Sequence, residues 1–175
     1  MKCKKSLLST LLLLMLPASL NACMGSRTAP VSSCTLLTAA DAQAALGGPV
    51  EAPFEGDGGN TDPKSAASLC DYKLKLKTDK TKVPMIRLFV RWFDREEDAA
   101  QTFVGWTSVE TQSSSAPVRP VSGLGQQAIW VPGTQQLGVL KGRIMLYVLV
   151  MEIPDSESAA RAAAKKVLGR IPARW

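Results

Sequence analysis

The segment CDYKLKLK, Cys70–Lys77, alternates strictly between side chains that avoid water and side chains that carry charge. A period of two is that of a β-strand with one face buried and the other in water. Lysines on an exposed strand usually keep it soluble, although this row could also meet an anionic polymer or lipid headgroups. Besides Asp71, the wet face would carry a row of lysines, namely Lys73, Lys75 and Lys77.

Apolar runs downstream of this segment predict four more strands. Residues 78–82 turn the chain, and Met85–Trp92 is expected to pair with the first strand as a hairpin. The runs 128–131, 136–141 and 144–153 follow, and the tight turns between them join them as consecutive hairpins. Consecutive hairpins require antiparallel pairing, so the sequence predicts an antiparallel sheet.

A short helix is expected before the first strand. Thr38 is a good N-cap, Asp41 is its capping-box partner, and Gly47 or Gly48 ends the helix. The polar, turn-rich residues 55–68 that follow are expected to form an exposed loop.

Two later helices complete the predicted fold. One begins in Asp94-Arg-Glu-Glu97, whose acids suit a helix N-terminus, and its apolar stripe runs to about Ser108. The other is capped by Asp155 or Ser156 and ended by Gly169. The order is therefore α-β-β-α-β-β-β-α. It predicts an α+β domain, an antiparallel sheet with the helices packed on one face.

Residues 1–22 have the layout of a secretory signal peptide. Lys2, Lys4 and Lys5 give a positive start, and Leu7–Leu16 is apolar apart from two hydroxyl side chains. As a helix this run would be about 15 Å long, against about 30 Å of bilayer hydrocarbon. It can enter the export machinery but is too short to remain as a membrane span.

The end of this segment, Leu20-Asn-Ala-Cys23, decides how it is processed. An ordinary cleavage site has small residues at the first and third positions before the cut. Ala22 suits the first position, but Leu20 is too bulky for the third. The motif instead resembles the lipobox of bacterial lipoproteins, which implies a diacylglycerol on Cys23, with acyl chains such as palmitate, and cleavage before it. Asn21 departs from the usual Ala or Ser. The alternative is a secreted protein whose Cys23 is incidental.

The same motif predicts domain organisation and location. Residues 1–22 are the signal peptide, 23–33 a flexible tether and 34–175 a single α+β domain. The lipid would hold the exported chain on a membrane of the cell envelope, and Met24 favours the outer membrane where the organism has one. Loss of three lysines with the signal peptide lowers the formal net charge from +6 to +3, and no nucleic acid partner is expected.

The four cysteines sort by compartment. Cys3 leaves with the signal peptide and Cys23 is assigned to lipid, so Cys34 and Cys70 remain as an even pair in an oxidising compartment. We expect a disulfide between them, worth about 3–4 kcal/mol on the chain-entropy model. Two reduced buried cysteines, or a bridge to another molecule, are the alternatives.

An ordered set of short motifs carries a family resemblance. The set resembles small bacterial, often actinobacterial, lipoproteins whose mature domain opens Cys-x-Leu-Leu-Thr and continues to Ala-Leu-Gly. The resemblance covers nearly all of residues 34–168 and implies the disulfide and an α+β domain. It implies no active site, because the family is functionally uncharacterised. The motifs are Cys34-Thr-Leu-Leu-Thr38, Ala45-Leu-Gly47, Cys70-Asp-Tyr72, Gly123-Leu-Gly125, Ala128-Ile-Trp130 and Leu140-Lys-Gly142.

Catalytic signatures are missing from the sequence. The chain has no histidine, which excludes Ser/His and Cys/His nucleophile pairs. No Ser-x-x-Lys occurs, and the pair Glu96–Glu97 is typical of a solvated helix start. Without histidine or a close cysteine pair, a zinc site is not expected, and no cofactor is predicted.

The remaining motifs are better explained by structural roles than by ligand binding. Gly123-x-Gly125 precedes a strand and predicts a turn that needs special backbone angles, not a phosphate loop. Trp92 and Trp130 lie in predicted strands and are expected in the core, whereas Trp106 and Trp175 are freer to stack on a sugar or peptide.

Together these features favour a non-catalytic binding or interaction module, anchored in the envelope, whose partner is an envelope protein or glycan. The alternative is a structural or stress-related envelope lipoprotein without a specific ligand. An enzyme of unknown type is the third hypothesis, which a deep pocket with convergent carboxylates would support.

Overall fold

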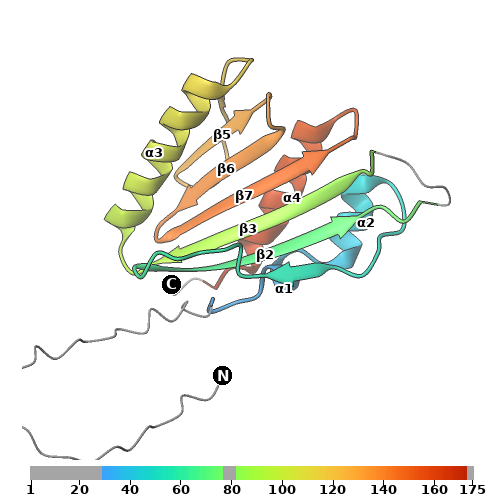
Figure 1. The fold of residues 1–175 in the computed structure, drawn as a ribbon, viewed down its shortest axis with the longest axis horizontal. Helices are drawn as coiled ribbons and strands as arrows, with labels where there is room; N and C mark the ends of the chain where they lie inside the picture. The colour runs from blue at the N-terminus through green and yellow to red at the C-terminus, as the bar shows by residue number, and fades with distance from the viewer. Residues whose placement is uncertain (1–28, 77–81, 173–175) are drawn as a thin grey trace, which may run out of the picture.

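The computed structural model describes residues 29–76 and 82–172. Within these residues the chain forms four helices and one seven-stranded sheet (Figure 1). The elements are, in chain order, α1 (Ser33–Leu36), α2 (Ala39–Leu46), β1 (Phe54–Gly56), β2 (Ser65–Lys73), β3 (Met85–Phe93), α3 (Glu96–Ser113), β4 (Arg119–Pro120), β5 (Gln127–Val131), β6 (Gln136–Lys141), β7 (Ile144–Met151) and α4 (Ser156–Arg170).

The sheet is antiparallel throughout, with the strand order β1-β2-β3-β7-β6-β5-β4. The predicted hairpins β2–β3, β5–β6 and β6–β7 are all present. β3 and β7 pair in the middle and place Phe89 opposite Tyr147. The predicted α+β class is therefore confirmed.

One face of this sheet, which we call the closed face, carries the main core. The even-numbered side chains of β3 and β7 are all buried there, and α1, α2 and α4 pack on them. Figure 1 shows α4 crossing behind the sheet. Trp92 and Trp130 belong to this core, as predicted.

The prediction that the helices share one face is wrong, because α3 packs on the opposite face. Phe103 of α3 joins Phe93 and Met145 in a separate small core there. The reason lies in β3 and β7, which carry apolar side chains on both faces near Phe93 and Met145 and therefore need cover on both.

The prediction of an exposed loop at residues 55–68 is also wrong at both of its ends. Residues 54–56 form the edge strand β1, and 65–68 begin β2 with all four side chains buried. Ser68 Oγ accepts from the Ser33 backbone N–H at 2.8 Å, and Ser33 Oγ donates to the Ser68 carbonyl at 2.7 Å. Small hydroxyl residues are typical of loops, but here a buried hydroxyl group of β2 forms a hydrogen bond with α1.

The helix ends follow the sequence in part. Thr38 and Asp41 form the predicted capping box, and Gly47 ends α2 with a φ of 75°. Asp155 caps α4 by accepting from the Ser158 N–H.

The predicted end of the last helix is wrong, because Gly169 lies inside α4, which continues to Arg170. The continuation brings the Arg170 guanidinium to Asp41 and to the Leu36 carbonyl, where it stabilises the last turn.

The Cys34–Cys70 disulfide is present and joins α1 to β2 across 36 positions, with 5.1 Å between the Cα atoms. Four predicted features lie outside the described residues: the signal peptide, the expected lipid attachment at Cys23, Lys77 and Trp175. Among the residues that the structure describes, no helix combines the length and hydrophobicity needed to cross a membrane.

Candidate functional site

The second face of the sheet is only partly covered. On β7, Met145 is buried beneath α3, whereas Tyr147, Leu149 and Met151 are half-buried. On β3 the side chains of the same face are half-buried from Met85 to Arg91. We call the uncovered part the open strip; it consists of Leu69, Met85, Arg87, Phe89, Leu149 and Met151.

A cleft of about 340 Å³ lies where the open strip meets α3. Its walls come from two neighbouring rows of the sheet, which the strand register defines. One row contains Leu69, Phe89 and Tyr147, and the next contains Arg87, Leu149 and Gln136. Trp106 of α3 completes the lining. The cleft thus has a mainly apolar lining, with two polar side chains, Arg87 and Gln136, in one of its two rows.

Three aromatic rings form one wall of the cleft. Trp106 and Tyr147 meet edge to face at 4.7 Å between ring centroids, and Phe89 lies 5.8 Å from Tyr147. Gly138 makes this possible, since a Cβ atom there would lie 2.1 Å from the Trp106 ring. The missing side chain lets the indole lie directly on β6.

Arg87 is held in place by Asp71, its cross-strand neighbour. Its Nε and Nη2 donate to the two carboxylate oxygens at 2.7 and 2.6 Å. The hydrogen bond to Asp71 raises the pKa of Arg87 above its ordinary value, so the guanidinium is always charged. Within the described residues, neither Arg87 Nη1 nor the Gln136 carboxamide has a hydrogen-bond partner. Both remain able to bind a ligand.

The Tyr147 hydroxyl is not a candidate acid or base. It donates to the Met145 Sδ at 3.2 Å, and burial raises its pKa well above the ordinary range. Of the described carboxylates near the cleft, Asp71 is engaged by Arg87, and Glu110 on α3 acts on Tyr147 through its charge, which also raises the pKa of that tyrosine. The cleft can therefore bind a ligand through apolar contact and hydrogen bonds, but it does not bring an acid and a base together.

Most residues that the sequence singled out lie apart from the cleft. Lys73 and Lys75 are exposed, as are Glu96 and Glu97 in the first turn of α3. Gly123 and Gly125 have φ values of 79° and 58°, which confirms the turn. Trp106, one of the two tryptophans expected to be free to stack on a ligand, lines the cleft. The described residues contain no cluster of three or more potential metal ligands.

A larger hollow of about 510 Å³ lies between α2 and α4. Alanines form much of its wall, and its buried carboxylate, Asp41, pairs with Lys166 at 3.0 Å and with Arg170. Because Asp41 also accepts from Thr38, its polar atoms are already used in holding the two helices together. We therefore place the candidate site at the smaller cleft.

Sequence reasoning missed the polar residues of the cleft, Arg87 and Gln136. A signal was present, since Met85–Phe93 reads MIRLFVRWF and its arginines alternate with buried residues. Such alternation indicates a strand with one half-wet face. It cannot show that α3 leaves that part of the sheet uncovered. Gln136 gave no signal that separates it from other strand-end glutamines.

Comparison with protein-family models, with curated proteins and with solved structures finds no match to this chain. The resemblance to small bacterial lipoproteins therefore stays a prediction.

Proposed function

We propose that this protein is a non-catalytic binding module of the bacterial cell envelope, held on a membrane by a lipid on Cys23. One observation carries the binding role: the cleft beside α3 offers three aromatic rings, two leucines and two uncommitted polar groups. Ligand sites are usually concave and mainly apolar, with a few polar groups that orient the ligand. The cleft has this composition and is within the usual size range.

Several features support the anchored location. The segment before the domain has a signal-peptide layout that ends in a lipobox-like Leu20-Asn-Ala-Cys23. The Cys34–Cys70 disulfide suits an oxidising compartment outside the cytoplasm. Several acyl chains on one residue hold a protein firmly, at about 0.8 kcal/mol per buried CH₂, so no second anchor is needed.

Ligand binding is tested by comparing two variants across a panel of envelope-derived small molecules. Leu149→Gln places an amide in the cleft, while Val104→Gln makes the same kind of change on a side chain that is 62% exposed and lies outside the cleft lining. We expect ligands that raise the Tm of wild type and of Val104→Gln but not of Leu149→Gln. A panel in which no compound discriminates the two variants would refute the cleft as a site.

The anchor is tested by replacing Cys23 with Ala and following the precursor. We expect the variant to lose incorporation of labelled palmitate and to leave the membrane fraction. Asn21→Ala, which restores the usual lipobox residue, should leave lipidation intact or increase it. Unchanged membrane association of Cys23→Ala would disprove the lipid anchor.

A further inference from the structure

The apolar surface of the cleft continues along the strands as a narrow path. From the row of Phe89 and Tyr147 it passes Leu149 and reaches the cross-strand pair Met85 and Met151. The four steps along β3 from Met85 to Phe89 span about 13 Å at the usual rise of a strand. All five side chains are half-buried. The path is thus long and one or two strands wide, a shape that suits a chain better than a compact ring system.

The far end of the path is positively charged. Lys73 is the cross-strand neighbour of Met85, and it is exposed with no ion pair among the described residues. In the next row, Arg87 keeps its Nη1 group unused, while Asp71 is fully engaged by that arginine. An anionic group placed between Lys73 and Arg87 would therefore meet two cations and a carboxylate that is already neutralised.

The other end of the path is closed and aromatic. Trp106 stands over Gly138 beside Tyr147, so α3 forms the end wall of the cleft. The cleft volume of about 340 Å³ suits one small molecule or one chain. A helix, at about 10 Å in diameter, is a poor fit for it. A flat bilayer surface cannot enter a cleft with an end wall.

We propose that the open strip and its cleft bind a free single-chain anionic amphiphile, such as a fatty carboxylate. The chain lies along Met85, Leu149 and Phe89 and ends against Trp106, and the anionic head meets Lys73 and Arg87. Methionine side chains, which are flexible and polarizable, adapt to a chain that has no fixed shape. This inference rests on the proposed function and names the class of ligand.

A chain-length series tests the apolar path. Binding of octanoate, decanoate and dodecanoate to the full chain carrying Cys23→Ala is measured below their micelle concentrations by calorimetry. Burial of each further methylene should tighten binding by up to about fourfold, so each step of two methylenes lowers the Kd by up to about fifteenfold. A Kd that does not change with chain length would overturn the proposal.

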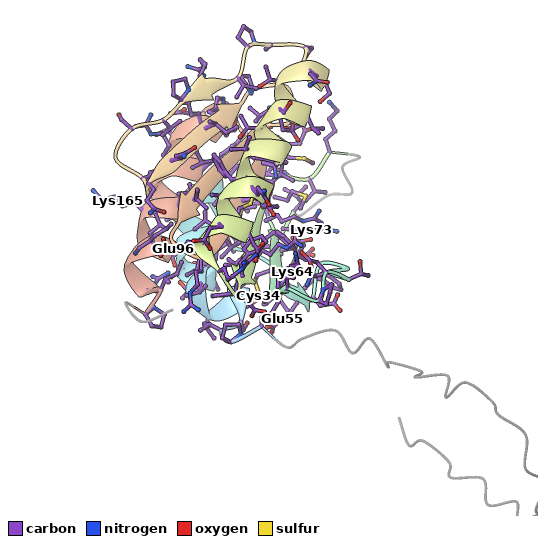
Figure 2. The ribbon with its side chains drawn as sticks, turned by 90° about the vertical axis from the view of Figure 1, so that its left-hand side faces the viewer. Cys34, Glu55, Lys64, Lys73, Glu96 and Lys165 are labelled. Carbon is purple, nitrogen blue, oxygen red and sulfur yellow. A yellow bond between two sulfur atoms is a disulfide. The ribbon has the colours of Figure 1, made fainter. Side chains whose placement is uncertain are left out.

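A pair of charge variants tests the head site. Lys73→Gln should weaken decanoate binding by about three- to tenfold, whereas binding of uncharged decyl maltoside should not change. Lys165→Gln is the matched control, because Lys165 lies on α4, and Figure 2 shows it on the opposite side of the domain from Lys73. Equal effects of Lys73→Gln and Lys165→Gln would show only a general loss of charge and would overturn the head site.

Two further arms separate this inference from the proposed function. If Leu149→Gln abolishes binding of another ligand class while decanoate does not bind wild type, the cleft is a site but the amphiphile is the wrong ligand. If no ligand discriminates Leu149→Gln from Val104→Gln, both proposals fail. Co-sedimentation of the Cys23→Ala chain with anionic phosphatidylglycerol vesicles, unaffected by decanoate, would favour a membrane surface over a free amphiphile and overturn the inference.

Discussion

Helices cover the two faces of the sheet to different extents. On the closed face three helices bury one side of the strands, and Leu88, Leu146 and Val148 are completely inaccessible. On the second face, α3 is the only described helix, where it covers a smaller core around Phe103, and the side chains of the open strip beyond it are half-buried. The closed face holds the fold together, whereas the second face leaves apolar surface available.

Links between the helices, and from a helix to the sheet, reinforce the closed face. The Cys34–Cys70 disulfide joins α1 to β2, and Asp41 links α2 to α4 through Lys166 and Arg170. A fold that is secured on one side can leave apolar surface exposed on the other, which is where binding sites are commonly found. The contrast predicts that equivalent substitutions will have different costs on the two faces.

The largest effect is expected from Leu146→Ala on the closed face. Leu146 is completely buried in the middle of β7, so truncation leaves a cavity that three helices hold open. We expect a loss of about 3–5 kcal/mol in the free energy of unfolding, measured by urea denaturation. A loss below about 1 kcal/mol would contradict the assignment of the main core to this face.

Removal of the disulfide by Cys34→Ala with Cys70→Ala should cost about 3–4 kcal/mol, because the unfolded chain regains the entropy of an open loop. Urea denaturation of the double variant provides the measurement. Wild type in the presence of a reductant should unfold at the same midpoint as the variant. Equal stability of oxidised wild type and the double variant would rule out a stabilising role.

Asp41→Asn should cost about 1–3 kcal/mol at pH 7. Burial alone would raise the pKa of Asp41, but hydrogen bonds from Arg170, Thr38 and Lys166 outweigh it and hold that pKa well below its usual range. A lowered pKa in the folded state gives stability that is present above about pH 4 and is lost as the pH falls.

The difference between wild type and Asp41→Asn should therefore shrink when urea denaturation is repeated between pH 4 and pH 2. Glu51→Gln, a change at an exposed carboxylate, is the control and should have no effect at either pH. A difference that stays constant with pH would show that the Asp41 charge does not stabilise the fold.

Gly138→Ala tests how the aromatic wall is seated. The added Cβ would overlap the Trp106 ring, so the ring must move or the strand must shift, at about 1–2 kcal/mol. Tryptophan emission should move to longer wavelength, and this change should vanish in a Trp106→Phe background. Gly105→Ala on the exposed side of α3 is the contrast, because it meets no neighbour and should stabilise the helix by up to about 1 kcal/mol. An unchanged spectrum for Gly138→Ala would contradict the described contact.

The smallest effect is expected from Leu149→Ala on the open strip. Leu149 follows Leu146 on the same strand but is half-buried, and no helix of the described part of the chain covers it, so the cost should be below about 1 kcal/mol. The free energy of unfolding from urea denaturation, compared with that of Leu146→Ala, sharpens the contrast between the faces. Equal losses in the free energy of unfolding for the two leucine variants would contradict the contrast between the two faces.

Much of the fold could be predicted from local patterns. The alternation in Cys70–Lys77, the apolar runs and the glycine turns predicted five of the seven strands and their antiparallel pairing, because strand periodicity and turn chemistry act over a few residues. The first of them, β2, ends earlier, at Lys73, and Asp71 on its expected wet face is buried beside Arg87. The capping box of Thr38 and Asp41 is equally local. The strand formed by Ser65–Ser68 was missed, because its hydroxyl groups are satisfied by α1, far away in the sequence.

The sequence by itself predicted five of the seven strands, the starts of α2, α3 and α4, and the pairing of Cys34 with Cys70, since each depends on neighbouring residues or on counting. It did not predict the edge strands β1 and β4 or the helix α1. Only the tertiary structure decided which face each helix covers. An apolar stripe on α3 must be buried, but the stripe does not specify the surface that buries it. The packing of α3 on the second face leaves Arg87, Leu149 and Trp106 around one cleft, so the candidate site is a property of the packing and not of any motif.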